Sequence, residues 1–303
     1  MYYLRRFDPW RNPLCTCPPK YSLAPYTGCS HKCLYCYATA YIGVRDSVAK
    51  KDFIPRLKRD LDRADPRLHV SMSNSSDPYP PVEARLGLTR ETLRLLLSRG
   101  FKVLVITKSD LVARDVDLLV KGPASISITI TTSDDYLASR VERGAPPPSR
   151  RMEALARLIE EKVPVSVRVD PVIPGLNDDP EALRSLVKEL AYLGVRHVVT
   201  STYKARWDNL ARLSREFPDK AQTWRELYLV KGEKVRGYFY LPKSLRARLL
   251  RPVVEAAREY GLTYATCREG LKTRRYFNAP TCDGSHLIPL RKAQASRWGW
   301  SPL

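Results

Sequence analysis

Apolar runs rich in β-branched residues alternate with amphipathic segments along the first two thirds of the chain. The runs stand at residues 68–74 (LHVSMSN), 102–107 (KVLVIT), 124–131 (ASISITIT), 163–170 (VPVSVRVD) and 196–202 (RHVVTST). Because their apolar positions are nearly continuous, they predict parallel strands that are covered on both faces. A shorter segment at 21–27 precedes them, so the pattern predicts six strands in total.

The amphipathic segments between these runs predict helices at residues 89–99, 114–121, 149–161 and 179–193. The first of them begins at Thr89, a favourable N-cap, and ends before Gly100, a favourable C-terminal residue. Strand–helix units of this kind build an open doubly wound sheet or a barrel, and a complete barrel needs eight strands. We therefore expect an α/β fold, an incomplete (β/α)6 TIM-type barrel, with the open sheet as the alternative.

The alternation of strands and helices stops after residue 205. Helical segments are expected at 206–230 and 242–260, and a Cys- and Arg-rich tail follows at 265–303. The expected organisation has three parts, which are an N-terminal extension with a cysteine pair (1–20), a partial barrel (21–205) and a helical, Cys-rich C-terminal elaboration packed on the barrel (206–303).

Each predicted strand ends in polar residues. These exits read SNSSD (73–77), TKSD (107–110), TTSDD (131–135), DPVIPG (170–175) and STYK (201–204). Turns are generally polar, but the carboxyl ends of parallel strands meet at one edge, where α/β proteins carry their sites. The five exits together predict a single polar mouth.

The composition sets the broad class of the protein. Of its 303 residues, 44% are hydrophobic, as in an ordinary globular protein. There is no run of about eighteen apolar residues, so we expect no membrane partner. The first residues, MYYLRRFDPWRNP, lack the apolar core of a secretory signal. We therefore expect a cytoplasmic protein with reduced thiols, and seven cysteines, an odd number, argue against a complete disulfide framework.

The charge of the chain is strongly positive. Lys and Arg number 52 against 32 acidic residues, which gives a net charge of +20. Such a surplus attracts polyanions and favours a nucleic-acid partner. Thermophilic surface chemistry is the alternative, although thermophile surfaces usually add acidic residues along with basic ones.

Three of the cysteines, Cys29, Cys33 and Cys36, lie within eight residues. Zinc prefers four ligands, and His31 is awkwardly close in sequence to serve as the fourth. A cubane 4Fe–4S cluster held by three thiolates keeps one iron without a protein ligand. We favour this open cluster over zinc or simple buried thiols, because the triplet follows the expected first strand of a parallel α/β system.

The triplet, Cys29-Ser-His-Lys-Cys33-Leu-Tyr35-Cys36, resembles the CxxxCxφC signature of radical S-adenosylmethionine (SAM) enzymes, with Tyr35 as the aromatic residue φ. The segments SNSSDPYPPVE (73–83), TKSDLVARDVDLL (107–119) and VRVDPVIPGLND (167–178) resemble the branch that contains spore photoproduct lyase. The tail motif CREG…CDGSHLI resembles uncharacterised archaeal relatives in that branch.

The resemblance implies a mechanism. SAM would bind the open iron, and one electron from a donor such as ferredoxin or flavodoxin would cleave it to a 5′-deoxyadenosyl radical that abstracts hydrogen from the substrate. With the positive charge, it implies an enzyme of lyase or transferase type acting on nucleic acid, in lesion repair or base modification. The alternatives are a radical SAM enzyme for a small metabolite or protein side chain, and a non-catalytic nucleic-acid-binding iron–sulfur protein.

The resemblance also assigns positions around SAM. Ser73 and Asn74, with Asp77 nearby, stand where the family binds the SAM amino group, and turn capping is their alternative role. Lys108 would pair with the SAM carboxylate unless it is a solvated loop lysine. Arg168, within a strand, needs an anion, which SAM or an acidic side chain would supply.

Further positions concern adenine and the return of hydrogen. The segment 172–175, including Ile173, resembles the family's backbone contact to adenine, and Tyr37 would contact the same ring or pack locally. Spore photoproduct lyase carries a cysteine near the end of the second strand that returns hydrogen to the product radical. No cysteine stands at 71–77 here, so Tyr79 or Tyr203 would do so, or no donor is needed.

The other four cysteines form two pairs, Cys15 with Cys17 before the barrel and Cys267 with Cys282 after it. Four thiolates make one complete ligand set, and chain ends often lie close together. We expect a second, fully ligated 4Fe–4S cluster at these residues. Structural zinc remains an alternative, and so do buried thiols or disulfides.

Overall fold

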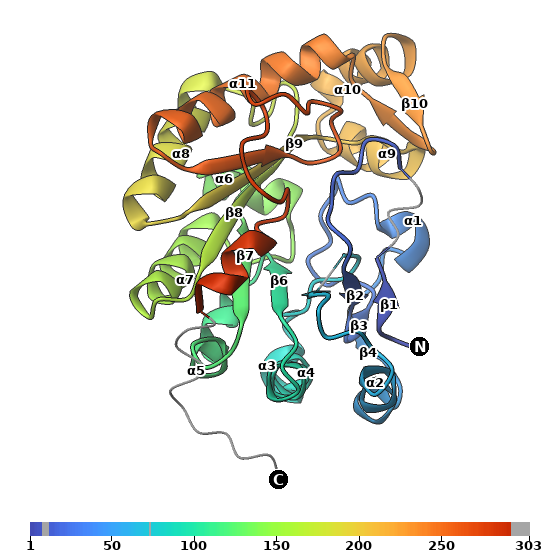
Figure 1. Ribbon diagram of the computed structural model, residues 1–303. Coiled ribbons are helices and arrows are strands. Elements are labelled where there is room, and N and C mark those ends of the chain that lie inside the picture. Colours follow the sequence, from blue (N-terminus) through green and yellow to red (C-terminus); the bar gives the residue numbers. More distant parts are fainter. Residues whose placement is uncertain (8–11, 73, 292–303) are drawn as a thin grey trace.

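The computed structural model describes residues 1–7, 12–72 and 74–291, and its centre is a mostly parallel sheet of eight strands (Figure 1). In sheet order they are β1 (Arg5–Arg6), β2 (Tyr21–Leu23), β5 (Val70–Met72), β6 (Val103–Thr107), β7 (Ala124–Thr129), β8 (Val165–Val172), β9 (His197–Thr202) and β12 (Thr263–Thr266). Strand β1 pairs antiparallel with β2, whereas the later neighbours are parallel. All six predicted strands are present and lie in chain order.

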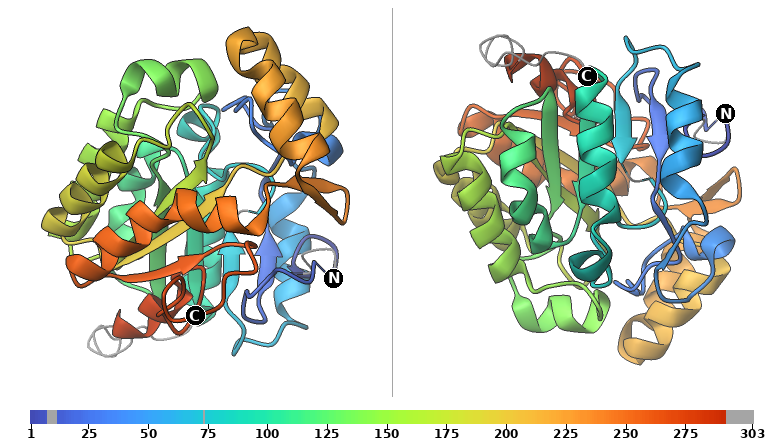
Figure 2. Two further views of the ribbon diagram at one scale, coloured as in Figure 1. Left: turned by 90° about the horizontal axis from the view of Figure 1, so that it is seen from above. Right: turned by 90° about the horizontal axis from the view of Figure 1, so that it is seen from below.

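Helices connect consecutive strands and lie around the outside of the sheet (Figure 2). The connecting segments are α4 (Leu88–Ser98), the 3₁₀ turn η1 (Asp110–Asp115) with α5 (Val116–Leu119), α7 (Pro148–Glu160), α8 (Pro180–Leu193) and α11 (Lys243–Glu259). The four helices predicted between strands are therefore confirmed, the second of them partly as a 3₁₀ turn. The structure adds α2 (Phe53–Leu61), α3 (Glu83–Leu86) and α6 (Asp135–Val141).

The sheet has a seventh parallel strand that the sequence pattern did not predict. Strand β12 pairs with β9 through residues 263–266, between the predicted helix at 242–260 and the first residues of the predicted Cys- and Arg-rich tail. Its four residues, TYAT, are too few to show a strand period. The strand order runs from β1 to β12, and no pairing among the described residues joins those two ends.

The region after β9 contains three successive helical segments and a hairpin. The predicted helix at 206–230 is divided into α9 (Trp207–Glu216), α10 (Pro218–Arg225) and a π-helical turn, η2 (Glu226–Val230). Pro218 stands at the first position of α10, where a missing N–H costs nothing. The hairpin β10 (Glu233–Val235) and β11 (Tyr238–Tyr240) precedes α11, and η3 (Ser285–Arg291) follows β12.

The two faces of the sheet differ in polarity, as β7 shows. Ile126 and Ile128 are fully buried in the main apolar core. Ser125, Ser127 and Thr129 alternate with them and are also buried. Because side chains alternate between faces, the Ser and Thr side chains share the opposite face, and Thr129 lines a cavity there. Strand β7 is therefore buried on both faces, with an apolar face in the core and a face of small polar side chains on the cavity side.

Among the described residues, no helix is long and apolar enough to cross a bilayer.

Candidate functional site

A single cavity brings together all seven cysteines. They reach it from the N-terminal extension, the loop after β3, the end of β12 and the segment before η3, and they are Cys15, Cys17, Cys29, Cys33, Cys36, Cys267 and Cys282. Four of the five polar strand exits also line it, through Asp77, Lys108, Asp170 and Ser201. The exit at 131–135 does not contribute. The predicted polar mouth is therefore a cavity at the carboxyl ends of the strands.

The cysteine triplet lies on a tightly held loop between β3 (Tyr26–Thr27) and α1 (Thr39–Ile42). Gly28 begins the loop with a φ of +72°, and a Cβ there would stand 2.2 Å from the carbonyl oxygen of Asp46. The Cys29 N–H donates to the Arg45 carbonyl at 2.9 Å, and the Leu34 N–H donates to Val141 at 2.8 Å. These contacts hold the three thiols on one side of the cavity.

The triplet thiols are free and lie in a desolvated setting. Burial, with help from Asp77, raises the pKa of Cys29 to about 11, and burial also raises the pKa of Cys33. Across the described part of the chain, no group of three or more His, Cys, Asp or Glu side chains could hold a single metal ion. A cluster makes a different demand, because each thiolate binds its own iron. Three free thiols around one cavity suit a cluster better than zinc.

Tyr35, the aromatic residue of the triplet, is fixed by a buried network. Its hydroxyl donates to Glu142, which also accepts a hydrogen bond from Thr131 Oγ1 at 2.7 Å. Arg151 Nη2 lies 2.6 Å from Glu142 Oε2, and both side chains are fully buried. Burial raises the pKa of Glu142, but Arg151 and Lys108 outweigh it, so the net shift is downward. The carboxylate stays charged and orients Tyr35 beside the cysteines.

Lys108 lines the cavity without an anionic partner. Its Nζ lies 5.5 Å from the centre of the Tyr35 ring, and no carboxylate among the described residues forms an ion pair with it. Burial lowers the pKa of Lys108, but electrostatic interactions with Cys33 and Glu142 outweigh it and the net shift is upward. A charged lysine without a fixed partner is available to an anionic ligand group, and the predicted pairing of Lys108 with the SAM carboxylate stays a prediction.

Asn74 and Asp77 line the cavity, as predicted, and Asp77 organises the polar exits. Asp77 accepts hydrogen bonds from Thr107 Oγ1 at 2.7 Å and from the Lys108 N–H at 2.8 Å, and His31 Nδ1 lies 3.3 Å away. Burial raises its pKa, yet these partners bring it down to about 2. The prediction for Ser73 falls outside the described residues.

Two other predicted SAM contacts have partners within the protein. Arg168 pairs with Asp170 at 2.5 Å and lies beside Cys267, so an acidic side chain supplies its anion. Ile173 is buried in an apolar cluster with Tyr35 and does not line the cavity. Tyr37 does line it, packed edge-on against another tyrosine, Tyr238, at 5.6 Å between ring centres.

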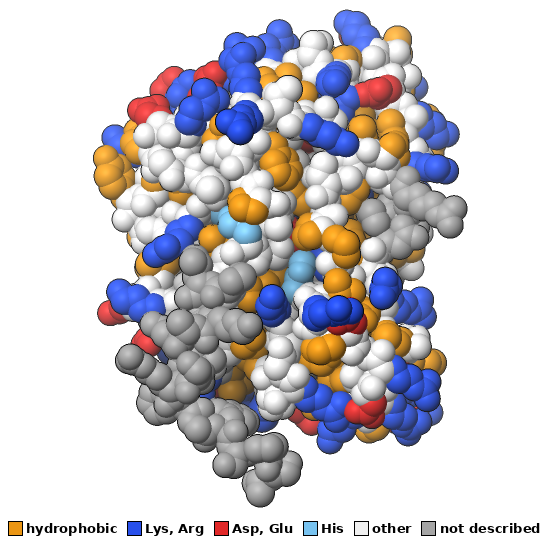
Figure 3. Space-filling model, viewed as in Figure 1, with side chains coloured by type: hydrophobic (Ala, Val, Ile, Leu, Met, Phe, Trp, Pro, Cys, Tyr) orange, Lys and Arg blue, Asp and Glu red, His pale blue; other side chains and the backbone are white. Residues whose placement is uncertain are grey.

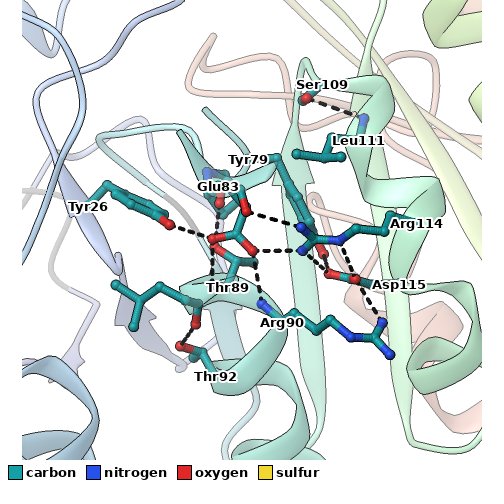
Figure 4. Close-up of polar contacts among 12 residues, drawn as sticks. Tyr26, Tyr79, Glu83, Thr89, Arg90, Thr92, Ser109, Leu111, Arg114 and Asp115 are labelled. Carbon is teal, nitrogen blue, oxygen red and sulfur yellow. Dashed lines mark hydrogen bonds and ion pairs between the residues drawn. The ribbon is translucent and has the colours of Figure 1, made fainter. Parts of the chain in front are cut away.

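The two predicted hydrogen donors lie in different places. Tyr79 is fully buried away from the cavity lining, and its hydroxyl donates to Asp115 at 3.0 Å (Figure 4). Arg114 joins Asp115 to Glu83 in the same network. This placement gives Tyr79 a role in packing α4 and η1, not in contacting a substrate. Tyr203 lines the cavity, and its hydroxyl donates to Asn209 at 2.6 Å.

The sequence analysis assigns no individual role to several residues of the cavity and its surroundings, although Asp170 and Lys204 lie within two of the predicted polar exits. Arg268 follows a predicted ligand directly, and Asp170 stands two residues after Arg168, so proximity to a motif was an available signal. Lys204 lines the cavity and pairs with the buried Glu269 at 2.9 Å. Glu142 lies between predicted elements, and nothing local in the sequence marks it.

Comparison with known proteins agrees with the cysteine loop and the sheet. The family model "Radical SAM superfamily" matches residues 23–187, more than half of the chain. An uncharacterised protein of Mycobacterium tuberculosis is 28% identical over 264 residues, which are 81% of this chain and 76% of that protein. A protein of Pseudomonas phage M6 named radical SAM Nα-GlyT isomerase is 24% identical over 258 residues, covering 81% of this chain and 53% of that protein.

The fold is similar to that of spore photoproduct lyase. A structure of a mutant of that enzyme with bound AdoMet and dinucleoside spore photoproduct aligns with a TM-score of 0.64 at 16% identity. The alignment covers 88% of this chain and 80% of the lyase. At this identity the likeness concerns the fold, and the family assignment depends on the match to residues 23–187. This chain belongs to the radical SAM superfamily.

Proposed function

We propose that this radical SAM enzyme acts on nucleic acid, in lesion repair or base modification. The observation that carries the proposal is the net charge of +20, which follows from 52 basic and 32 acidic residues. Lys and Arg side chains are spread over the face shown in Figure 3, with few acidic side chains among them. A positive surface of this kind attracts a polyanion.

The residues of the cavity fit the cofactors that the family implies. Cys29, Cys33 and Cys36 would hold the 4Fe–4S cluster, and Lys108 would pair with the carboxylate of SAM. Asn74 lies at the same wall, where an amide oxygen suits the SAM amino group. When bound, this pair supplies an organic radical able to abstract hydrogen from an unactivated carbon. The protein positions both partners and keeps water from the reacting atoms.

The likeness to spore photoproduct lyase gives separate support for a nucleic-acid substrate. That fold has been determined with a dinucleoside photoproduct bound, and it aligns with most of this chain. The absence of a cysteine at 71–77 argues that the reaction differs from thymine-dimer reversal by the lyase. Tyr203 is the predicted hydrogen donor that lines the cavity.

Nucleic-acid binding should weaken steeply as salt rises. We expect the affinity for a fluorescent single strand or duplex to fall at least about tenfold between about 50 and 200 mM salt, because bound Lys and Arg release counterions. Fluorescence anisotropy measures this directly, with an uncharged morpholino strand of the same sequence as the control. An affinity that is flat across this range would favour a small metabolite or a protein side chain as the substrate.

Lys108 should contribute to SAM affinity. Lys108→Met removes the unpaired cation while preserving most of the side-chain volume, so we expect the Kd for SAM to rise about 10-fold or more, as for loss of a charge-assisted contact. Lys108→Arg, which keeps the charge, should lose less. Equilibrium binding of radiolabelled SAM to the reconstituted protein provides the measurement. Equal affinities of wild type and Lys108→Met would remove Lys108 from the SAM site.

A further inference from the structure

We propose that Cys15, Cys17, Cys267 and Cys282 hold a second 4Fe–4S cluster, with every iron bound to a protein thiolate. This site lies in the wall of the same cavity as the triplet. The proposal concerns a metal site and does not depend on the identity of the substrate. Its ligands come from both ends of the chain, and the fold joins those ends by contacts that do not involve sulfur.

Strand β12 places the C-terminal half of the ligand set. Because β12 pairs in register with β9, Cys267 emerges at the carboxyl edge of the sheet, where its N–H donates to Thr200 at 2.9 Å. The N-terminal half is brought to the same point by Lys20, whose Nζ bonds Asp283 at 2.6 Å with both side chains buried. As a result, Cys17 Sγ and Cys282 Sγ lie 3.5 Å apart although 265 positions separate them in sequence.

Two buried polar groups beside these cysteines have no hydrogen-bond partner in the described part of the chain. Thr16 Oγ1 stands between the two N-terminal cysteines, and Arg268 Nη2 follows Cys267 directly. Arg268 is only 7% exposed and lines the cavity. Its guanidinium is held 4.9 Å from the ring centre of Tyr37. Unpartnered donors at this depth are costly, and sulfur atoms of an iron–sulfur cluster accept hydrogen bonds.

The charges around the four thiols suit a buried anion. Lys20 is bonded to Asp283 and Arg168 to Asp170, so each of these cations has a carboxylate. Arg268 is different, because no carboxylate among the described residues forms an ion pair with it. A four-thiolate 4Fe–4S cluster carries net negative charge, and burying it requires a nearby cation. Arg268 supplies that cation without having to break an existing ion pair.

A mononuclear zinc site or a pair of disulfides accounts for less of this arrangement. Among the described residues, no group of three or more candidate ligands could hold a single ion, although Cys17 and Cys282 are close together. All seven cysteines are free, and Cys17 is hydrogen-bonded to both Cys15 and Cys282, so a disulfide at Cys17 would use only one of these neighbours. The 3.5 Å contact between Cys17 and Cys282 is the spacing of two ligands on one ion, so a cluster requires these two side chains to separate when it binds. The cluster is favoured because it uses all four thiols and gives the unpartnered Arg268 an anion.

The test separates the two sites by removing each in turn. One variant carries Cys29→Ala, Cys33→Ala and Cys36→Ala, and the other carries Cys267→Ser and Cys282→Ser. After anaerobic reconstitution with iron and sulfide, we expect about eight irons per wild-type chain and about four in each variant. Adding SAM should change the EPR spectrum of the reduced Cys267→Ser/Cys282→Ser variant and leave that of the triplet variant unchanged. The matched control, Thr281→Ser, should retain about eight irons.

The triplet variant decides the question even if the Cys267→Ser/Cys282→Ser variant fails to fold, because it keeps all four proposed ligands. Retention of about four irons and four sulfides by a folded triplet variant supports the proposal. Iron-free triplet protein overturns it. Bound zinc without iron, measured by mass spectrometry of the metals, also overturns it. An intact protein mass lowered by the loss of thiol hydrogens would reveal a disulfide and would overturn it as well. Salt-dependent nucleic-acid binding by the triplet variant reports separately on the proposed function.

Discussion

Cys33→Ala should abolish formation of 5′-deoxyadenosine from SAM. Cys33 is the central thiol of the triplet, is 8% exposed and lines the cavity, so its removal takes away one of the three thiols that would hold the cluster. Loss of a partner outside the ligand set of a metal site typically costs about 10–100-fold, and loss of a ligand should cost more. We therefore expect a decrease beyond about 100-fold, measured by chromatography of anaerobic reactions containing dithionite and SAM.

Leu34→Met is the matched control for this loss. Leu34 is the next residue in the same loop, is buried and does not line the cavity, and the exchange nearly conserves volume. It should keep activity near that of wild type. Equal 5′-deoxyadenosine yields from Cys33→Ala and wild type would refute the role of the triplet. If the folded wild-type protein carried the cluster but made no 5′-deoxyadenosine, the result would instead support the non-catalytic alternative.

Arg151→Met should lower the free energy of unfolding by about 3–5 kcal/mol. Arg151 and Glu142 are both fully buried, and removal of the guanidinium leaves a carboxylate in the interior beside Cys33. The methionine fills much of the vacated volume, so the loss of charge pairing dominates over a cavity. Urea denaturation of the protein, followed by circular dichroism under anaerobic conditions, measures the change.

Two further variants distinguish charge pairing from packing. Adding Glu142→Gln to Arg151→Met removes the stranded charge, so part of the lost stability should return. Lys231→Ala breaks an ion pair with Glu226 whose side chains are 58% and 50% exposed, and it should cost at most about 1 kcal/mol. If Arg151→Met cost no more than Lys231→Ala, the buried pair would have little part in stability.

The sequence predicts the recurring strand–helix units of the fold. The strand at 124–129 shows a long β-branched pattern, and so does the strand at 165–172. Strand β12 shows none, because only four residues pair and their identity as a strand depends on β9 beside them. The division of the 206–230 segment was foreseeable from Pro218, whereas the π-helical turn after it depends on tertiary packing.

The residues of the candidate site also differ in whether the sequence predicts their positions. The spacing of the triplet and the rule that parallel strands end at one edge place Cys33, Asn74 and Lys108 at the cavity. That rule does not say how a chain turns after leaving the sheet, and so Tyr79, which follows Asp77 by two residues, turns back into the interior. The contact of Glu142 with Tyr35 spans 107 positions, and no local pattern encodes such a pair.

The wide sequence separation within the four-cysteine set has a consequence for biosynthesis. Cys17 leaves the ribosome long before Cys282, 265 positions later, so a cluster at the proposed four-cysteine site would not have its full ligand set until Cys282 had emerged. The triplet, by contrast, is complete once residue 36 has emerged, and the strands behind it follow in order. If the proposed second cluster forms, the triplet could therefore be loaded first, and the four-cysteine site only after the sheet between its ligands had been synthesised.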